Sequence, residues 1–273
     1  MVEAHAIVKR YGPKTVLDQV SVAVQPGQLT SFIGPNGAGK STLLSIMTRL
    51  VPADSGEVRL DGRPLSRYDS RELARRISVL RQFNHVPLRL TVRELVSFGR
   101  FPYSQGRLTK ADEAAVERAL AAMELEDIQH KLLDQLSGGQ RQRAFIAMVV
   151  AQETDYVFLD EPLNNVDMKH AVQVMKLLRR LVEEEGRSVV VVMHDVNLAA
   201  YYSDRVVALK EGCVAFDGPA RDVMEPATLK DVFDIEVAVG EVHSCRVCVY
   251  FAEAAQLLAN GRAAQDVVVP GLR

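Results

Sequence analysis

The chain begins with alternating hydrophobic and polar positions and continues with short, wholly apolar runs. HAIVKRY and TVLDQVSVAV alternate on either side of GPKT, which predicts two antiparallel strands joined by a turn. Later runs rich in Val, Ile and Leu have the composition of strands buried on both faces: LTSFIG, ISVL, YVFLD, SVVVVMH and RVVALK. Helical stretches alternate with several of them, which predicts a parallel sheet of the α/β class.

The interval from about residue 83 to 151 has a helical period instead. Apolar positions recur at helical spacing in TVRELVSFG, KADEAAVERALAAME and GQRQRAFIAMVVA, and no run there has a strand pattern. Thr91 and Glu94 have the spacing of a capping box. We therefore expect a helical subdomain inserted between two parts of the sheet.

The pattern weakens after about Pro219. A short helix is expected over PATLKDVF, followed by a pair of strands ending near Phe251. The expected division is one domain over residues 1–235 and a C-terminal extension over residues 236–273, whose last dozen residues we expect to be loosely ordered.

Composition narrows the class of protein. The content of 48% hydrophobic and 25% charged residues is that of an ordinary soluble globular protein, and a net charge of −2 gives no signal for a nucleic-acid partner. Three cysteines in 273 residues do not form a disulfide framework, which favours a reducing compartment. The apolar runs are too short to span a bilayer and the first residues do not have the pattern of a signal peptide, so membrane attachment is expected through a partner.

A glycine-rich stretch between a predicted strand and a predicted helix carries the first chemistry. GPNGAGKST fits the phosphate-binding pattern G-x-x-x-x-G-K-[ST], in which glycines let backbone N–H groups turn toward phosphate oxygens. Lys40 is expected to pair with the β- and γ-phosphates and the Ser41 hydroxyl to ligate Mg²⁺. The predicted ATP-binding residues here are Gly34, Pro35, Asn36, Gly37, Ala38, Gly39, Lys40, Ser41 and Thr42.

Acidic and imidazole side chains follow two of the apolar strands. Asp160 and Glu161 end YVFLDE, and His194 follows the next strand, so all three belong to the sheet edge where ligands gather. We expect Asp160 to hold Mg²⁺, and Glu161 to polarise the attacking water. We expect His194 to reach the γ-phosphate and that water. Glu161 and His194 are the predicted catalytic residues of an ATPase.

A second anion-binding pattern opens the helix in LSGGQRQRAFIAM. A serine and two glycines at a helix N-terminus offer a hydroxyl, free N–H groups and the positive end of the helix dipole. Residues 34–42 already hold the nucleotide, and the helical insertion is expected to keep Ser137 away from it. We therefore expect Ser137, Gly138 and Gly139 to meet the γ-phosphate bound by a second copy, with two ATP molecules in one twofold interface.

Together these motifs resemble those of the ATP-binding cassette (ABC) ATPases over about residues 1–217. LSGGQ matches the family signature, which adds Gln140 to the residues expected in trans. The resemblance implies that Tyr11 stacks on adenine and that Gln82 senses magnesium and links the site to a transmembrane partner. It also implies that Asp167 crosses the dimer interface; the usual Ser-x-Leu-Asp reads NNVD here, and only the aspartate is carried over. The expected cofactors are ATP and Mg²⁺, with Ser41, Gln82 and Asp160 as metal ligands.

The fold implied is an α/β P-loop NTPase core with a parallel sheet, an N-terminal antiparallel β part and an inserted α-helical subdomain. FGRFPYSQGRLT and DEPLNNVDMKHAVQVM resemble the ATPases of ferric-siderophore importers, a group that also serves haem and vitamin B12. The resemblance implies a peripheral subunit at the cytoplasmic face of the cell membrane. Its implied partners are a second copy, integral membrane permease subunits and, indirectly, an extracytoplasmic substrate-binding protein.

Other functions stay open at this stage. The same core serves ATPases for haem, vitamin B12 or metal import, exporters and regulatory ATPases. A soluble ABC ATPase of DNA repair or translation fits less well, because the chain has one P-loop and no long coiled coil.

Two other stretches have alternative interpretations. Phe98, Phe101 and Tyr103 form either a local core or a groove for another protein. Cys245 and Cys248 have C-x-x-C spacing, but in a strand residues three apart point to opposite faces, so packing is preferred over zinc binding.

Overall fold

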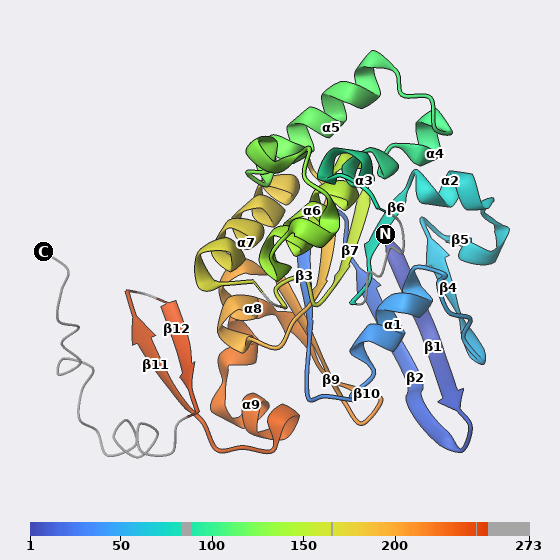
Figure 1. The fold of residues 1–273 in the computed structure, drawn as a ribbon. Helices are drawn as coiled ribbons and strands as arrows, with labels where there is room; N and C mark the ends of the chain where they lie inside the picture. Colours follow the sequence, from blue (N-terminus) through green and yellow to red (C-terminus); the bar gives the residue numbers. More distant parts are fainter. Residues whose placement is uncertain (83–88, 165, 244, 251–273) are drawn as a thin grey trace, which may run out of the picture.

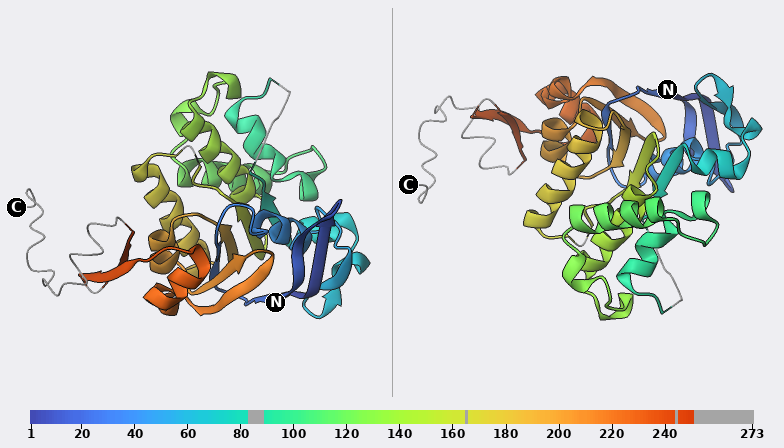
Figure 2. Two further views of the ribbon diagram at one scale, coloured as in Figure 1. Left: turned by 90° about the horizontal axis from the view of Figure 1, so that it is seen from below. Right: turned by 90° about the horizontal axis from the view of Figure 1, so that it is seen from above.

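The computed structural model describes residues 1–82, 89–164, 166–243 and 245–250 (Figures 1 and 2). The loose ordering expected of the last dozen residues lies outside these ranges. Within them, no helix is both long enough and apolar enough to cross a bilayer.

The N-terminal sheet is antiparallel and confirms the predicted hairpin. Strands β1 (Val2–Tyr11) and β2 (Lys14–Val24) pair along their length. β1 begins before the predicted stretch HAIVKRY, because its first residues also pair with the end of β2. With β4 (Ser55–Leu60) and β5 (Arg63–Pro64), the strand order is β2-β1-β4-β5.

The central sheet confirms the α/β class. Its strands are β3 (Leu29–Ile33), β6 (Ile77–Leu80), β7 (Tyr156–Asp160), β8 (Ser188–Val192), β9 (Arg205–Lys210) and β10 (Cys213–Pro219). The order is β10-β9-β3-β8-β7-β6, with β10 antiparallel to β9 and the other neighbours parallel. Every residue of β3, β7 and β8 is buried, as their continuous apolar runs predict.

The two faces of this sheet belong to different cores. Helix α1 (Lys40–Met47) and the N-terminal sheet share one core with Phe32 and Phe158. Ile33 and Leu159 contribute to the opposite core, because successive residues of a strand point to opposite faces. That second core includes helices α6 (Gly138–Ala151), α7 (Met168–Glu183) and α8 (Val196–Tyr202) (Figure 1).

Residues 89–151 fold as the predicted helices α3 (Val92–Phe98), α5 (Lys110–Ala122) and α6, with the short α4 (Phe101–Ser104) between the first two. In this described stretch, β pairing is limited to one isolated bridge between Thr91 and Leu132. The predicted capping box is confirmed: Glu94 N donates to Thr91 Oγ1 at 3.2 Å, and Thr91 N donates to Glu94 Oε2 at 2.7 Å.

Short helical elements also occur between the longer ones. They are α2 (Ser70–Ala74) and 3-10 turns at Leu65–Arg67, Glu126–Ile128, Leu133–Gln135 and Ala220–Met224.

A buried arginine ties these helices together. Arg100, 6% exposed, donates from Nε to Asp112 Oδ1 at 2.9 Å. Its Nη1 donates to the Ala151 carbonyl at 2.8 Å and to Glu153 Oε2 at 2.9 Å. These bonds join the start of α4 to α5 and to the end of α6.

We expect Arg100→Met to destabilise the fold by about 3 kcal/mol, because it leaves the buried Asp112 carboxylate with its hydrogen bonds from Thr109 but without its cationic partner. Thermal and urea unfolding measure the loss. The control is Arg118→Met: Arg118 also pairs with Glu153, but its side chain is 65% exposed, so we expect a change of about 0.5 kcal/mol or less. Equal effects of the two substitutions would contradict the prediction.

The C-terminal elements agree with the sequence. Helix α9 (Pro226–Phe233) covers PATLKDVF, and β11 (Ala238–Val242) pairs antiparallel with β12 (Cys245–Val249). Asn197 of α8 binds β12 from both amide atoms: Nδ2 donates to the Cys248 carbonyl at 3.2 Å, and Oδ1 accepts from Cys248 N at 2.7 Å. The division at residue 235 and the bounds 83–151 of the insertion stay predictions.

Candidate nucleotide-binding and catalytic site

The phosphate-binding loop lies between β3 and α1, as predicted, and its glycines are required by close packing. A Cβ atom on Gly34 would lie 2.0 Å from the Leu209 carbonyl oxygen, and one on Gly39 would lie 2.6 Å from Leu17 Cδ2. Both glycines also have positive φ angles, 135° and 104°. The loop therefore packs against β2 and β9 at distances that only glycine permits.

This loop borders a cavity of about 270 Å³. Lys40 Nζ donates to the carbonyl oxygens of Gly34 at 2.8 Å and Pro35 at 2.9 Å. Burial lowers the pKa of Lys40, while the charges of Glu161 and Asp160 oppose that change. The described residues that line the cavity are Val16, Asn36, Gly37, Gly39, Lys40, Ser41, Thr42, Gln82 and Glu161.

Asp160 and Ser41 place a carboxylate and a hydroxyl in contact beside the phosphate-binding loop. Ser41 Oγ donates to Asp160 Oδ1 at 2.8 Å. Burial raises the pKa of Asp160, although this hydrogen bond and the Lys40 charge act in the other direction. A hydroxyl and a carboxylate are hard oxygen donors of the kind that Mg²⁺ takes together with substrate phosphates, so the pair fits the predicted metal.

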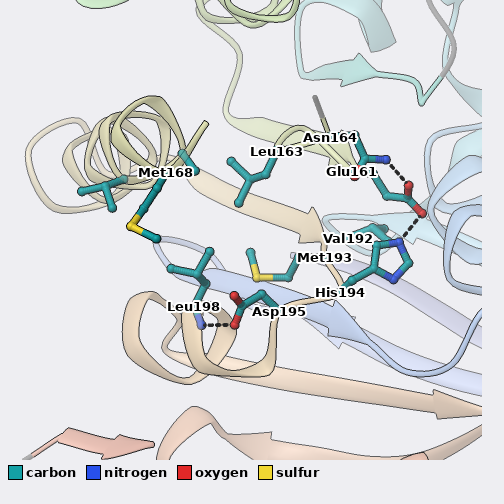
Figure 3. Close-up of a pocket in the computed structure, with 11 residues that line it drawn as sticks. Glu161, Leu163, Asn164, Met168, Val192, Met193, His194, Asp195 and Leu198 are labelled. Carbon is teal, nitrogen blue, oxygen red and sulfur yellow. Dashed lines mark hydrogen bonds and ion pairs between the residues drawn. The ribbon is translucent and has the colours of Figure 1, made fainter. Parts of the chain in front are cut away.

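Glu161 follows β7 in a left-handed conformation, with φ 51°. Its carboxylate is surrounded by nitrogen atoms: Oε2 accepts from Gln82 Nε2 at 2.6 Å and from Asn164 Nδ2 at 2.5 Å. Oε1 lies 2.8 Å from His194 Nε2 (Figure 3). Burial raises the pKa of Glu161, but the bonds from His194, Asn164 and Gln82 outweigh it and lower that pKa overall. Glu161 is therefore a carboxylate at neutral pH, as a general base must be.

The structure brings together side chains predicted from separate motifs. Strands β7 and β8 are neighbours, and this adjacency brings His194 to Glu161 as expected. Strand β6 adjoins β7 on the other side, which brings Gln82 to the same carboxylate. Beyond Glu161 and His194, a separate cavity of about 530 Å³ extends between α7 and α8 past Met168 and Leu198 (Figure 3).

The remaining predicted residues are not among the described residues that line the 270 Å³ cavity. Pro35 and Ala38 belong to the same loop, where Ala38 N donates to the Pro35 carbonyl at 3.2 Å. Tyr11 ends β1 with 52% of its surface exposed, and its ring centroid lies 5.4 Å from Lys9 Nζ. No residue of the signature is among the described residues that line the 270 Å³ cavity.

The residues predicted to act in trans cap helices of their own chain. Ser137 Oγ accepts from Gln140 N at 3.3 Å, Gln140 Oε1 accepts from Ser137 N at 3.1 Å, and α6 begins at Gly138. Asp167 caps α7 by accepting from His170 N at 2.9 Å. Ser137 and Asp167 therefore each serve as the N-cap of a helix in their own chain.

Asn164 is the side chain that sequence reasoning missed at this site. Only the aspartate of NNVD was given a role there, whereas Asn164 contacts Glu161 directly. An amide three residues after the acidic pair was the available signal. Nothing local, however, distinguishes it from an ordinary turn asparagine.

Comparisons with known proteins agree with this geometry. The family profile described as ABC transporter matches residues 17–164. The petrobactin import ATP-binding protein YclP of Bacillus subtilis is 57% identical over 92% of this chain and 100% of its own length. The petrobactin import ATP-binding protein FatE of Bacillus anthracis is 45% identical over 88% of this chain and 96% of its own length. A dimeric structure of a bacterial ABC transporter cassette superposes with a TM-score of 0.74 at 33% identity, covering 81% of this chain and 99% of that one.

Proposed function

This chain belongs to the ABC transporter family, and we propose that it is the ATP-hydrolysing subunit of an importer of ferric siderophores. The observation that carries the ATPase part is the Glu161 carboxylate, which lies beside the phosphate-binding loop and accepts hydrogen bonds from Gln82 and Asn164. The siderophore part rests on the names of the relatives, because the ATP site does not touch the transported molecule.

The proposed reaction is attack of water on the γ-phosphate. Glu161 accepts the proton of the water, while Lys40 and the loop N–H groups stabilise the charge on the phosphate oxygens. Mg²⁺ would be held by Ser41, Asp160 and Gln82 and would neutralise charge on the β- and γ-phosphates. His194, beside Glu161 Oε1, is proposed to orient the water and the γ-phosphate.

The second proposed feature is an ATP-dependent homodimer in which residues 137–140 and Asp167 contact the nucleotide of the other copy. It is supported by the position of Ser137 at the exposed N-terminus of a 14-residue helix and by the dimeric cassette at 33% identity. Ser137→Arg is expected to weaken ATP-driven dimerisation by about tenfold or more while sparing ATP binding by the monomer. Analytical ultracentrifugation with Glu161→Gln as the background measures it.

The comparison for this substitution is Ser137→Ala, which removes the helix cap and the hydroxyl as arginine does but adds no bulk or charge to the surface, so its loss of dimer should be smaller. A mixed dimer of Ser137→Arg and Lys40→Ala chains decides the geometry. Because one composite site would carry both lesions and the other neither, this mixture should keep part of its ATPase activity. An inactive mixture would contradict contact in trans.

Phe98 and Phe101 are the proposed contact for the permease. They are 47% and 57% exposed and line a groove of about 440 Å³ together with Leu90 and Leu108. Tyr103 is not among the described residues that line this groove, so the contact proposed here is smaller than the predicted cluster of three aromatic residues. Its ring stacks against the guanidinium groups of Arg100 and Arg75, at 4.2 Å and 5.2 Å.

Phe101→Ala is therefore expected to leave soluble ATPase activity nearly unchanged and to weaken docking of an apolar permease helix by about 2 kcal/mol. Co-purification with the permease and transport in vesicles measure the loss. Leu50→Ala removes a hydrophobic side chain of similar exposure, 47%, and serves as the control. Normal transport by Phe101→Ala would place the docking surface elsewhere.

The proposed location is the cytoplasmic face of the membrane, next to permease subunits that receive cargo from an extracytoplasmic binding protein. Deleting the gene is expected to abolish growth on a ferric siderophore of the petrobactin type as the only iron source. The wild-type gene should restore growth and the Glu161→Gln gene should not. Growth loss on haem instead would assign the subunit to that cargo, and adjacent genes for a permease and a binding protein would support the importer.

A further inference from the structure

Asn164 contacts Glu161 through two independent hydrogen bonds, one from its backbone and one from its side chain. Its backbone N–H donates to the Glu161 carbonyl at 3.3 Å, which closes the turn after β7. Its side-chain Nδ2 donates to Glu161 Oε2 at 2.5 Å (Figure 3). A substitution can therefore remove the side-chain contact without breaking the turn. Because Asn164 is exposed, it should also spare the core.

The donors are divided unequally between the two oxygens of the Glu161 carboxylate. Each carboxylate oxygen has about two lone-pair sites. Oε2 is matched by two amide donors, from Asn164 at 2.5 Å and from Gln82 at 2.6 Å. Among the described residues, the amide hydrogen bonds go to Oε2, whereas Oε1 lies 2.8 Å from His194 Nε2. Oε1 therefore keeps a lone pair for a proton.

Amide donors also determine which way the carboxylate faces. Glu161 follows its strand with φ 51°, so its side chain leaves the regular alternation of β7. Hydrogen bonds to an ionised oxygen are short and strongly directional, and two of them on one oxygen define the plane of the group. With only one amide, a single donor to Oε2 and the His194 contact to Oε1 remain, and the carboxylate is held less firmly against rotation about its last bond.

We propose that Asn164 is a positioning residue for ATP hydrolysis, which with Gln82 fixes Oε2 so that Oε1 accepts the proton of the attacking water. In this step the water O–H bond breaks and its proton bonds to Oε1. The electron pair of the water oxygen forms the new bond to the γ-phosphorus. The bond from that phosphorus to the bridging oxygen breaks, and its electrons leave with ADP. The inference rests on the proposed function, in which Glu161 is the base.

The test compares Asn164→Ala with Asn164→Asp. Alanine removes the donor, whereas aspartate keeps the shape and turn-forming ability of asparagine but offers only acceptor oxygens. We expect both substitutions to lower kcat by about tenfold or more, with aspartate the more damaging, and to leave KM for ATP within about twofold. A role in shaping the turn alone would leave Asn164→Asp at the wild-type kcat, and that result would overturn the proposal.

Two controls separate positioning from other effects. Gln173 donates to Glu124 Oε1 at 2.8 Å in an amide–carboxylate pair remote from the site, so Gln173→Ala should leave kcat unchanged. Adding Asn164→Ala to Glu161→Gln should not weaken the ATP-bound dimer; a loss of dimer would mean that Asn164 acts through the interface, and the proposal would fall.

The result for Glu161→Gln alone distinguishes a failure of the proposed ATPase function from a failure of the positioning role of Asn164. If that variant hydrolyses ATP normally, the general-base assignment fails and the role of Asn164 fails with it. If it is inactive while both Asn164 variants have normal kcat, the proposed function stands and only the positioning role is wrong.

Discussion

Glu161→Gln is expected to abolish steady ATP hydrolysis, lowering kcat by about 10²–10⁴-fold, while ATP binding stays intact. An amide cannot accept the proton of the attacking water, but it can preserve the local geometry. The amide oxygen can still accept from Gln82 and Asn164, and its NH₂ can donate to His194 Nε2 in the tautomer that leaves this nitrogen unprotonated.

The variant should therefore accumulate as an ATP-bound dimer. Size-exclusion chromatography with ATP measures the dimer, and phosphate release measures hydrolysis. Glu113→Gln, a change of the same kind at an exposed position of α5, should behave as wild type. Hydrolysis by Glu161→Gln at a near wild-type rate would show that another group removes the proton.

Lys40→Ala is expected to fail one step earlier, at nucleotide binding. Lys40 Nζ is fixed by two loop carbonyls at the mouth of the phosphate cavity, and its truncation removes the only lysine of the loop. Losing one partner of a buried charge interaction costs about 2–5 kcal/mol, so ATP affinity should fall about 30- to 4000-fold. Titration calorimetry measures it.

Stability provides the internal check for this variant. Burial disfavours the Lys40 ammonium and offsets its two hydrogen bonds to loop carbonyls, so its removal should have little effect on the thermal unfolding temperature without nucleotide. Lys176→Ala, at an exposed position of α7, is the matched control and should bind ATP normally. Unchanged affinity in Lys40→Ala would remove this lysine from the site.

Continuous stretches of sequence determined much of this protein. The phosphate-binding loop was predictable because the glycines, Lys40 and Ser41 follow one another along the chain, and their covalent order fixes most of the loop. Buried strands were predictable because their apolar runs have no other stable environment. The capping box at Thr91 and the helix over PATLKDVF depend on contacts within one or two turns, which sequence spacing also specifies.

Tertiary structure decided how separate segments meet. Gln82 and His194 reach Glu161 because β6 and β8 flank β7, and the identity of a strand's neighbours is only partly encoded in its own pattern. Asn164 joins them through a turn that begins with a left-handed Glu161. Periodicity reports which residues are buried; it does not report the direction in which a polar side chain points at a strand end.

The aromatic residues of the helical subdomain also show that sequence does not specify the direction in which a side chain points. Phe98, Phe101 and Tyr103 look alike in sequence, and only the packing separates them. Two are exposed along a groove, whereas Tyr103 lies against guanidinium groups from Arg75 and Arg100, which are distant in sequence from each other. Sequence determined that apolar and aromatic groups gather there. The approach of Arg75 from a distant segment, beside the neighbouring Arg100, decided that Tyr103 packs against guanidinium groups while Phe98 and Phe101 face solvent.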